Sequence, residues 1–199
     1  NPERHAKLFP MDLRPQAHEI IRTWAFYTIV KSHLHQNTIP WKNLMISGWC
    51  LAETKTTLSD NLSLGKPKAE KMSKSKGNII SPVGLIDEFG SDVVRYWAST
   101  AKLGADIVFS NTIMSIGKKL INKLWNATKF VNGFFKFIEK SLQINHLLIN
   151  NIIYEEMDLW LLARLAKTVN KAKDEFDVFE YHAARLAIED FFWHDFCDN

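Results

Sequence analysis

The chain has 199 residues, a formal net charge of +3 and a hydrophobic fraction of 46%, values typical of an ordinary folded protein and not of a disordered or fibrous one. Its apolar runs fall short of the roughly 20 residues that a membrane-spanning helix needs, and no secretory signal pattern opens the sequence, so we expect no membrane association. The two cysteines, Cys50 and Cys197, fit a reduced cytoplasm better than a disulfide framework.

The first predicted elements form an α/β arrangement. Apolar side chains recur at helical spacing over residues 15–35, and Pro15 suits the first position of a helix. Residues 44–48 form a short apolar run, as expected for a buried parallel strand. A helix followed by such a strand predicts the last part of an open α/β sheet, where ligands lie beyond the carboxyl ends of the strands. Trp49 and the residues that follow it should therefore lie near a site.

Residues 53–70 are rich in Thr, Ser, Asp, Asn, Gly and Lys, which predicts an exposed loop that could include a small hairpin. Further along, Ser81 and Pro82 are typical of the cap and first residue of a short helix, which Gly90 should end. Ser91 should begin a second short helix.

Helices are predicted for the rest of the chain. Residues 112–140 fit one helix of about 28 residues, with the apolar side chains on one arc. The members of this arc are Ile113, Ile116, Leu120, Leu124, Ala127, Val131, Phe134, Phe135 and Ile138. The opposite side carries Lys118, Lys129, Lys136 and Lys140, and Trp125 points toward these lysines. This side is interpreted as a solvated surface, with Trp125 packing on a neighbouring domain or stacking on RNA as alternatives.

Two more amphipathic helices should follow. The predicted core side chains of the first are Met157, Leu161, Leu165, Val169, Ala172 and Phe176. Asp177 and Glu180 resemble a capping box at the start of the next, whose predicted core side chains are Phe179, Ala183, Leu186, Ala187 and Phe191. Three consecutive amphipathic helices predict an α-helical bundle.

The most informative segment is Lys71-Met-Ser-Lys-Ser-Lys-Gly-Asn78. Lysines meet phosphate as point charges, and serine hydroxyls add hydrogen-bond donors. Gly77 and Asn78 tolerate the positive φ that lets a loop bend around one anion. This chemistry favours a polyphosphate site, with a solvated basic loop as the alternative.

Residues 71–75, Lys-Met-Ser-Lys-Ser, form the signature loop of class I aminoacyl-tRNA synthetases, and the chain resembles this family over most of its length. Four more segments resemble the family, at residues 12–24, 46–51, 122–130 and 191–198. These flanking segments resemble the valyl branch, in its archaeal-like form, more than the isoleucyl or leucyl branches. The second signature of the class, His-x-Gly-His, does not occur, so the chain is expected to be a carboxyl-terminal part that is inactive alone.

The resemblance implies the last part of a Rossmann-type nucleotide-binding domain (residues 1–70), the signature loop with linking helices (71–110) and an all-α anticodon-binding bundle (111–199). It implies ATP with Mg²⁺, valine and tRNA(Val) as the partners of a monomeric cytoplasmic enzyme that makes valyl-adenylate and transfers valine to tRNA. Isoleucyl or leucyl enzymes are alternatives, since the signature loop does not distinguish amino acids. A non-catalytic RNA-binding module is an alternative of another class.

The resemblance also implies the site residues. Lys71 and Lys74 would be the catalytic lysines that contact the phosphates of ATP. The other residues of the expected ATP site are Met72, which would anchor the loop, Ser73 and Ser75, which would donate hydrogen bonds or cap the turn, and Gln16, Glu19 and Gly48. Glu19 would accept hydrogen bonds from ribose, although an acid in the first turn of a helix is also common for structural reasons. No metal site is expected, because His194 and Cys197 are too few ligands.

Overall fold

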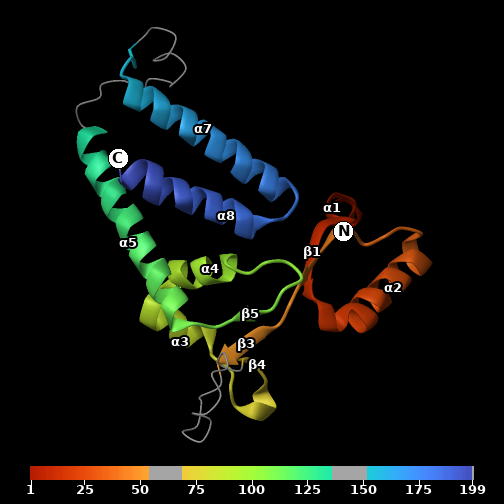
Figure 1. Ribbon diagram of the computed structural model, residues 1–199. Helices are drawn as coiled ribbons and strands as arrows, with labels where there is room; N and C mark the ends of the chain where they lie inside the picture. The colour runs from red at the N-terminus through yellow and green to blue at the C-terminus, as the bar shows by residue number, and fades with distance from the viewer. Residues whose placement is uncertain (54–68, 136–151, 199) are drawn as a thin grey trace, which may run out of the picture. The chain divides into compact units, whose positions relative to one another are not determined.

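The computed structural model in Figure 1 describes residues 1–53, 69–135 and 152–198. The chain divides into two compact units, one made of Asn1–Ser81 with Ala101–Ser110 and the other of Pro82–Thr100 with Asn111–Asn199. Among the described residues, no helix combines the length and the apolar character needed to cross a membrane.

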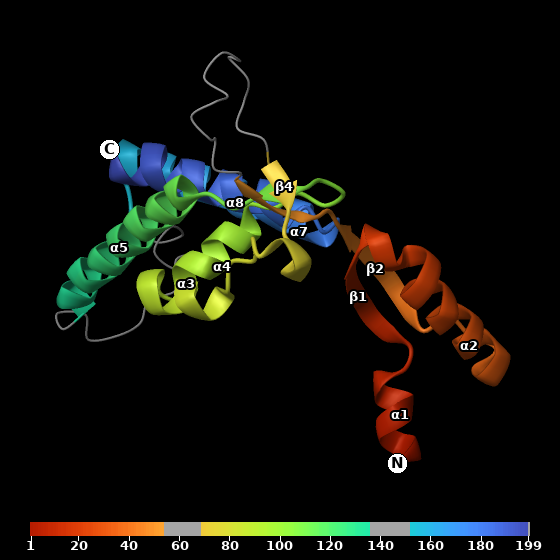
Figure 2. The same ribbon diagram turned by 90° about the horizontal axis from the view of Figure 1, so that it is seen from below.

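The first unit contains a β-α-β arrangement that follows α1 (Pro2–Leu8). Strand β1 (Met11–Ala17) pairs in parallel with β2 (Trp41–Ser47), and α2 (Phe26–Gln36) lies between them in the sequence. Parallel strands need such a crossover, because a tight turn cannot connect their ends. Figure 2 shows β1 and β2 alongside each other, near α2.

The prediction that a helix begins at Pro15 is wrong. Pro15 lies within β1 opposite Met45, and only α2 and the short turns before it, which begin at His18, are helical. Proline is tolerated in this strand because, among the described residues, β1 pairs on one side only, so its missing N–H costs little. The apolar spacing of the segment continued across the boundary between strand and helix and concealed it.

The parallel strand predicted at residues 44–48 is confirmed, since it forms the second half of β2. Its burial was predicted incorrectly: Trp41 is buried, whereas Leu44 is exposed. Full burial of a parallel strand requires cover on both faces of the sheet, and the described residues cover this strand only in part.

A second sheet carries the signature loop. Strand β3 (Cys50–Glu53) is its central strand, paired antiparallel to β4 (Ala69–Lys71) and parallel to β5 (Ile107–Val108). Most of the predicted loop over residues 53–70 lies outside the described residues, but the strands that flank it pair as a hairpin does. The signature loop follows β4 directly.

The second unit is helical and begins with the two short helices that the sequence predicted. Helix α3 (Pro82–Phe89) ends before Gly90, which has a φ of 90°, and α4 (Ser91–Ser99) follows. Both predictions are confirmed, because proline, serine and glycine act through local backbone geometry.

Three further helices are described: α5 (Asn111–Phe134), α7 (Glu156–Asp177) and α8 (Tyr181–Asp190), which a π-helical turn (Phe191–Cys197) extends. Helix α4 packs against α5, and α7 against α8. Gly117 permits the first of these contacts, because a Cβ there would lie 2.5 Å from the ring of Tyr96.

The predicted core arc of α5 is wrong in part. The buried residues of this helix are Met114, Gly117 and Leu120, of which the prediction included only Leu120, and Phe134 is exposed. The side that packs on α4 is the buried one, and periodicity alone does not show which side has a partner. Phe135 is also exposed, and Ile138 lies outside the described residues.

The polar side of α5 agrees with the prediction where it is described. Trp125 is 64% exposed, and the ammonium of Lys129 lies 5.9 Å from the centroid of its ring. Lys118 is exposed as well, whereas Lys136 and Lys140 lie outside the described residues. Trp125 therefore faces the lysines and not the core.

The predicted capping box at Asp177 and Glu180 is wrong. Asp177 is the last residue of α7, and Glu180 precedes α8 without a capping hydrogen bond from its side chain. Phe179, with a φ of 64°, reverses the chain instead. The core prediction for α8 is also shifted: Ala184 and Phe192 are buried, whereas Leu186 is exposed.

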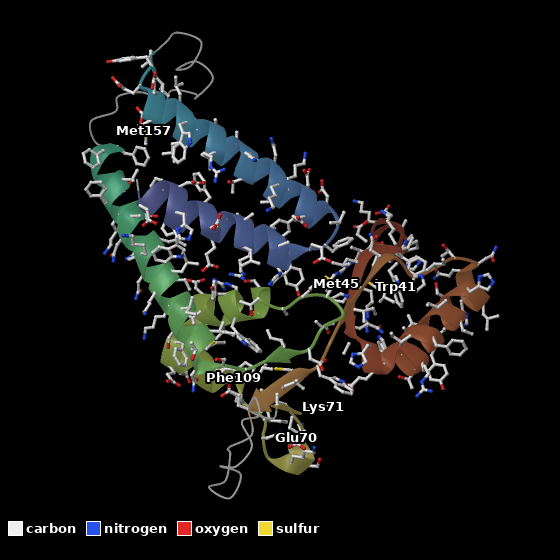
Figure 3. The ribbon with its side chains drawn as sticks, in the orientation of Figure 1. Trp41, Met45, Glu70, Lys71, Phe109 and Met157 are labelled. Atoms are coloured by element: carbon white, nitrogen blue, oxygen red, sulfur yellow. The ribbon has the colours of Figure 1, made fainter. Side chains whose placement is uncertain are left out.

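The core prediction for α7 is correct at one position and wrong at others. Ala172 is buried, whereas Met157, labelled in Figure 3, Val169 and Phe176 are exposed. The outcome resembles that of α5, because the described residues cover only the part of each apolar arc that has a neighbouring helix.

Candidate functional site

The signature loop is a compact bend. A 3-10 turn (Lys74–Lys76) is followed by Gly77, whose φ of 65° lies in the left-handed region that glycine adopts at little cost. Asn78 closes the bend: its side-chain oxygen accepts from the backbone N–H of Ser73 at 2.8 Å, and its side-chain nitrogen donates to the carbonyl of Lys71 at 3.2 Å. One amide side chain thus ties both ends of the bend together.

The bend is also tied to the sheet. The backbone N–H of Met72 donates to the carbonyl of Cys50 in β3 at 3.1 Å, and the Met72 side chain is half-buried. The hydroxyl groups of Ser73 and Ser75 lie 2.7 Å apart and hydrogen-bond to each other. In this conformation the two serines serve the loop itself, which is one of the two roles that the sequence allowed.

The three lysines of the loop differ in their partners. Lys71 forms an ion pair with Glu19, and Lys76 forms one with Glu70. Glu70 directly precedes Lys71 in β4, and both residues are labelled in Figure 3. Lys74 is exposed and has no ion-pair partner among the described residues. Its ammonium is therefore the one that can meet an incoming anion without breaking a contact.

Glu19 lies at the centre of a small cluster. Its Oε2 accepts from the indole N–H of Trp49 at 3.2 Å and also from the ammonium of Lys71. That ammonium lies 4.9 Å from the centroid of the Trp49 ring, a cation–π distance. The imidazole ring of His18 also packs against the Trp49 ring, with the two ring centroids 4.8 Å apart. The Nδ1 of His18 lies 3.3 Å from the carbonyl oxygen of Ser47.

Gly48 and Trp49 are placed by a close backbone contact. A Cβ on Gly48 would lie 2.2 Å from the carbonyl oxygen of Ala105, so only glycine fits there without a shift. The backbone N–H of Trp49 donates to the carboxylate of Asp106 at 2.7 Å. The glycine at the end of β2 thus lets the segment before β5 approach, and Asp106 then holds Trp49.

Gln16 lies in β1 opposite Ile46 and is 8% exposed. Neither polar atom of its side-chain amide has a hydrogen-bond partner in the described part of the chain. A buried amide without a partner is costly, so this side chain is a candidate for contact with a bound molecule.

The structure brings Glu19, Gly48 and Lys71 together, at the carboxyl ends of β1 and β2. Lys74 and Ser75 are exposed. The sequence prediction placed Trp49 and Asn78 near the site but missed the hydrogen bonds of their side chains, and it did not include His18 or Asp106. His18 directly follows a strand, a position from which it could have been suspected. The pairing of Asp106 with Trp49, 57 residues apart, has no local signal.

We expect the Glu19 contact to respond to pH. The hydrogen bond from Lys71 is the main reason why the pKa of Glu19 lies below its usual value of 4.5, with smaller help from Trp49 and His18 against an opposing effect of burial. Because the folded pKa is lowered, the contact contributes fully above 4.5 and is lost as the pH falls through the lowered value.

Fluorine NMR of 5-fluorotryptophan protein measures this, with the Trp49 signal identified by its loss in Trp49→Phe. We expect an acid-induced shift of that signal with its midpoint below 4.5, absent in Glu19→Gln. An acid step that does not come from Glu19 would persist in Glu19→Gln. An identical acid step in both proteins would contradict the prediction.

Within the described residues there is no group of three or more side chains that could hold a metal ion. His194 instead lies near two acids of its own turn, with Nδ1 3.3 Å from Asp198 and Nε2 3.9 Å from Asp190. Cys50 is half-buried, and burial raises the pKa of its thiol.

Comparison with known families agrees with this arrangement. Residues 1–110 match the family described as tRNA synthetases class I (I, L, M and V), and residues 158–199 match the anticodon-binding domain of tRNA ligase. The first match covers more than half of the chain, so the chain belongs to the class I tRNA synthetases.

The similar individual proteins include valine–tRNA ligases. The chain is 52% identical to a valine–tRNA ligase of Rickettsia felis and 51% identical to one of Rickettsia canadensis, in each case over its whole length. It spans only 22% and 23%, respectively, of the length of these relatives.

The fold has a counterpart among solved structures. A LeuRS of Agrobacterium radiobacter K84, in a ternary complex with tRNA and LeuAMS, matches 92% of this chain and 22% of its own chain. The TM-score is 0.64 and the sequence identity is 20%, so the likeness concerns the fold.

Proposed function

We propose that the chain is part of a valine–tRNA ligase, which converts valine and ATP to valyl-adenylate and pyrophosphate and then transfers valine to tRNA(Val). The observation that carries the proposal is the signature loop, held beside Glu19 at the carboxyl ends of β1 and β2, in a chain that is about half identical to valine–tRNA ligases. Ligands of α/β sheets bind at such strand ends.

In this proposal, different residues of the site contact different parts of the nucleotide. Glu19 accepts hydrogen bonds from the ribose hydroxyls, and Gly48 lets the backbone approach the adenine. The amide of Gln16, buried and without a partner among the described residues, contacts the adenylate. Lys71 and Lys74 contact the phosphates, and Met72, Ser73 and Ser75 hold the loop on them.

The lysines would promote adenylate formation by stabilising the negative charge on the leaving group. When the carboxylate of valine attacks the α-phosphate of ATP, negative charge grows on the departing pyrophosphate. Ammonium groups aimed at that charge bind the transition state more strongly than the ground state, and this lowers the barrier. Mg²⁺ would enter with the ATP, since it binds substrate phosphates readily and keeps several waters.

We further propose that residues 1–70 complete a Rossmann-type domain, that 71–110 link it to the rest, and that 111–199 form the bundle that faces tRNA. Supporting this, the second unit is helical and residues 158–199 match an anticodon-binding domain. The exposed Trp125 beside Lys129 would then pack on a neighbouring domain or on RNA.

Pyrophosphate exchange with the full-length protein tests the amino acid. We expect exchange with valine and about 10- to 200-fold less with isoleucine or leucine in kcat/KM, the discrimination that one added methylene allows in an apolar pocket. Exchange that prefers isoleucine or leucine would assign the protein to that branch. Binding of tRNA without exchange for any amino acid would favour an RNA-binding module.

A further inference from the structure

The Lys71 ammonium is held by two neighbouring side chains and is not directed freely into solvent. It is engaged by the carboxylate of Glu19 and by the face of Trp49, 4.9 Å from the ring centroid. The side chains of Lys71 and Glu19 are 41% and 42% exposed, so a ligand can reach this contact from solvent. An ion pair of this exposure is weak enough for a ligand to displace.

The oxygens of Glu19 are used unequally. Oε2 accepts from both Lys71 and Trp49, whereas Oε1 has no partner among the described residues. A ribose presents two neighbouring hydroxyl groups, and a carboxylate accepts two such donors best with both of its oxygens. A ribose bound in this way needs Oε2, the oxygen that Lys71 occupies.

Trp49 sets the geometry of this competition. Its indole N–H fixes Oε2, its ring lies against the Lys71 ammonium, and its own backbone is held by Asp106 at 2.7 Å. The indole N–H does not titrate, so it holds the carboxylate equally at every pH near neutral.

We propose that Trp49 is a positioning residue that holds Lys71 on Glu19, and that the ribose hydroxyls of a bound nucleotide displace Lys71 from Glu19 toward the phosphates. This inference rests on the proposed nucleotide site. Recognition of the ribose and release of a phosphate-binding lysine are then one event, so the lysine is freed only when a ribonucleoside is in place.

The loop contains its own controls. Lys76 is also paired, but with Glu70, which no ribose is proposed to contact, and Lys74 has no ion-pair partner among the described residues. A general loosening of the loop would change all three lysines, whereas the proposed exchange changes Lys71 alone.

The experiment is trace acetylation of the full-length protein, with the rate at each lysine resolved by mass spectrometry. The probe is adenosine, which has the ribose hydroxyls but no phosphate that could cover a lysine; 2′,3′-dideoxyadenosine is the matched control. We expect adenosine to raise labelling of Lys71 by about two- to fivefold, the ratio that a partly exposed ion pair supports, without changing Lys74 or Lys76. Dideoxyadenosine should leave all three rates unchanged.

The variant Trp49→Phe keeps an aromatic face and removes the N–H donor. We expect it to raise Lys71 labelling in the empty protein and to reduce the further increase caused by adenosine, while Trp49→His, which keeps a ring N–H, restores part of the protection. If Lys71 were acetylated as slowly in Trp49→Phe as in the wild-type protein, the positioning role would be contradicted.

Calorimetry of adenosine and ATP binding separates the two levels of the hypothesis. Adenosine that binds without raising Lys71 labelling overturns the release mechanism and leaves the nucleotide site standing. Failure of both adenosine and ATP to bind removes the nucleotide site, and the release mechanism with it.

Discussion

Replacing Lys74 by alanine in the full-length protein should lower the kcat of valine-dependent pyrophosphate exchange by about 10²- to 10³-fold, the usual effect of removing one group that stabilises transition-state charge. Lys74 is the exposed lysine of the loop that has no ion-pair partner among the described residues, so its charge is available to the departing pyrophosphate. Affinity for tRNA should change little, because the loss falls on the chemical step.

The matched control is Lys76→Ala in the same loop. Lys76 is paired with Glu70, so its removal should cost much less in kcat than the removal of Lys74. Exchange kinetics and tRNA binding by filter retention measure the two quantities. Equal losses of turnover and tRNA affinity in Lys74→Ala would argue against a catalytic role and favour the RNA-binding alternative.

Replacing Gly48 by alanine should displace the backbone of Ala105 and Asp106, which supports the site. The new Cβ would lie 2.2 Å from the carbonyl oxygen of Ala105 and 2.6 Å from the backbone nitrogen of Asp106, and both are backbone atoms that cannot rotate away. We expect a loss of about 1–3 kcal/mol in local stability, as for other overpacked sites. The KM for ATP should rise, because Asp106 would no longer hold Trp49 in place.

Hydrogen exchange followed by mass spectrometry measures the local effect. The amides of Gly104 and Ile107 donate to the carbonyls of Ile46 and Trp49 at 3.0 and 2.9 Å, so their exchange should accelerate in Gly48→Ala. The control is Gly84→Ala in α3, where a Cβ meets nothing within 4 Å. That change should stabilise its helix by about 0.5–1 kcal/mol. Unaltered exchange at Gly104 and Ile107 would show that the backbone relaxes around the methyl group.

Part of the candidate site could be predicted from the sequence. Lys71 and Lys74 were found because they belong to one short signature, and Gly48 and Glu19 because they lie near a strand end and within a recognisable segment. The partner of each lysine could not be predicted. Lys71 and Glu19 are 52 residues apart, and only the pairing of β1 with β2 and of β3 with β4 brings them together.

The same division applies to the fold. Helices α3 and α4 were predicted correctly, because their proline, serine and glycine residues act on neighbouring backbone. Pro15 was assigned to a helix and lies in β1, because a strand is stabilised by a partner that is distant in sequence. The buried side of α5 was also missed, since burial depends on which element lies alongside.

The sequence by itself determined the cationic chemistry of residues 71–78, the class of protein to which the chain belongs and the places where short helices begin and end, because these properties reside in contiguous residues. The tertiary structure alone decided that Lys71 rests on Glu19 and Trp49 while Lys74 stays exposed. Charges become paired or available only when strands from separate segments set the distances between them, and no local pattern encodes those distances.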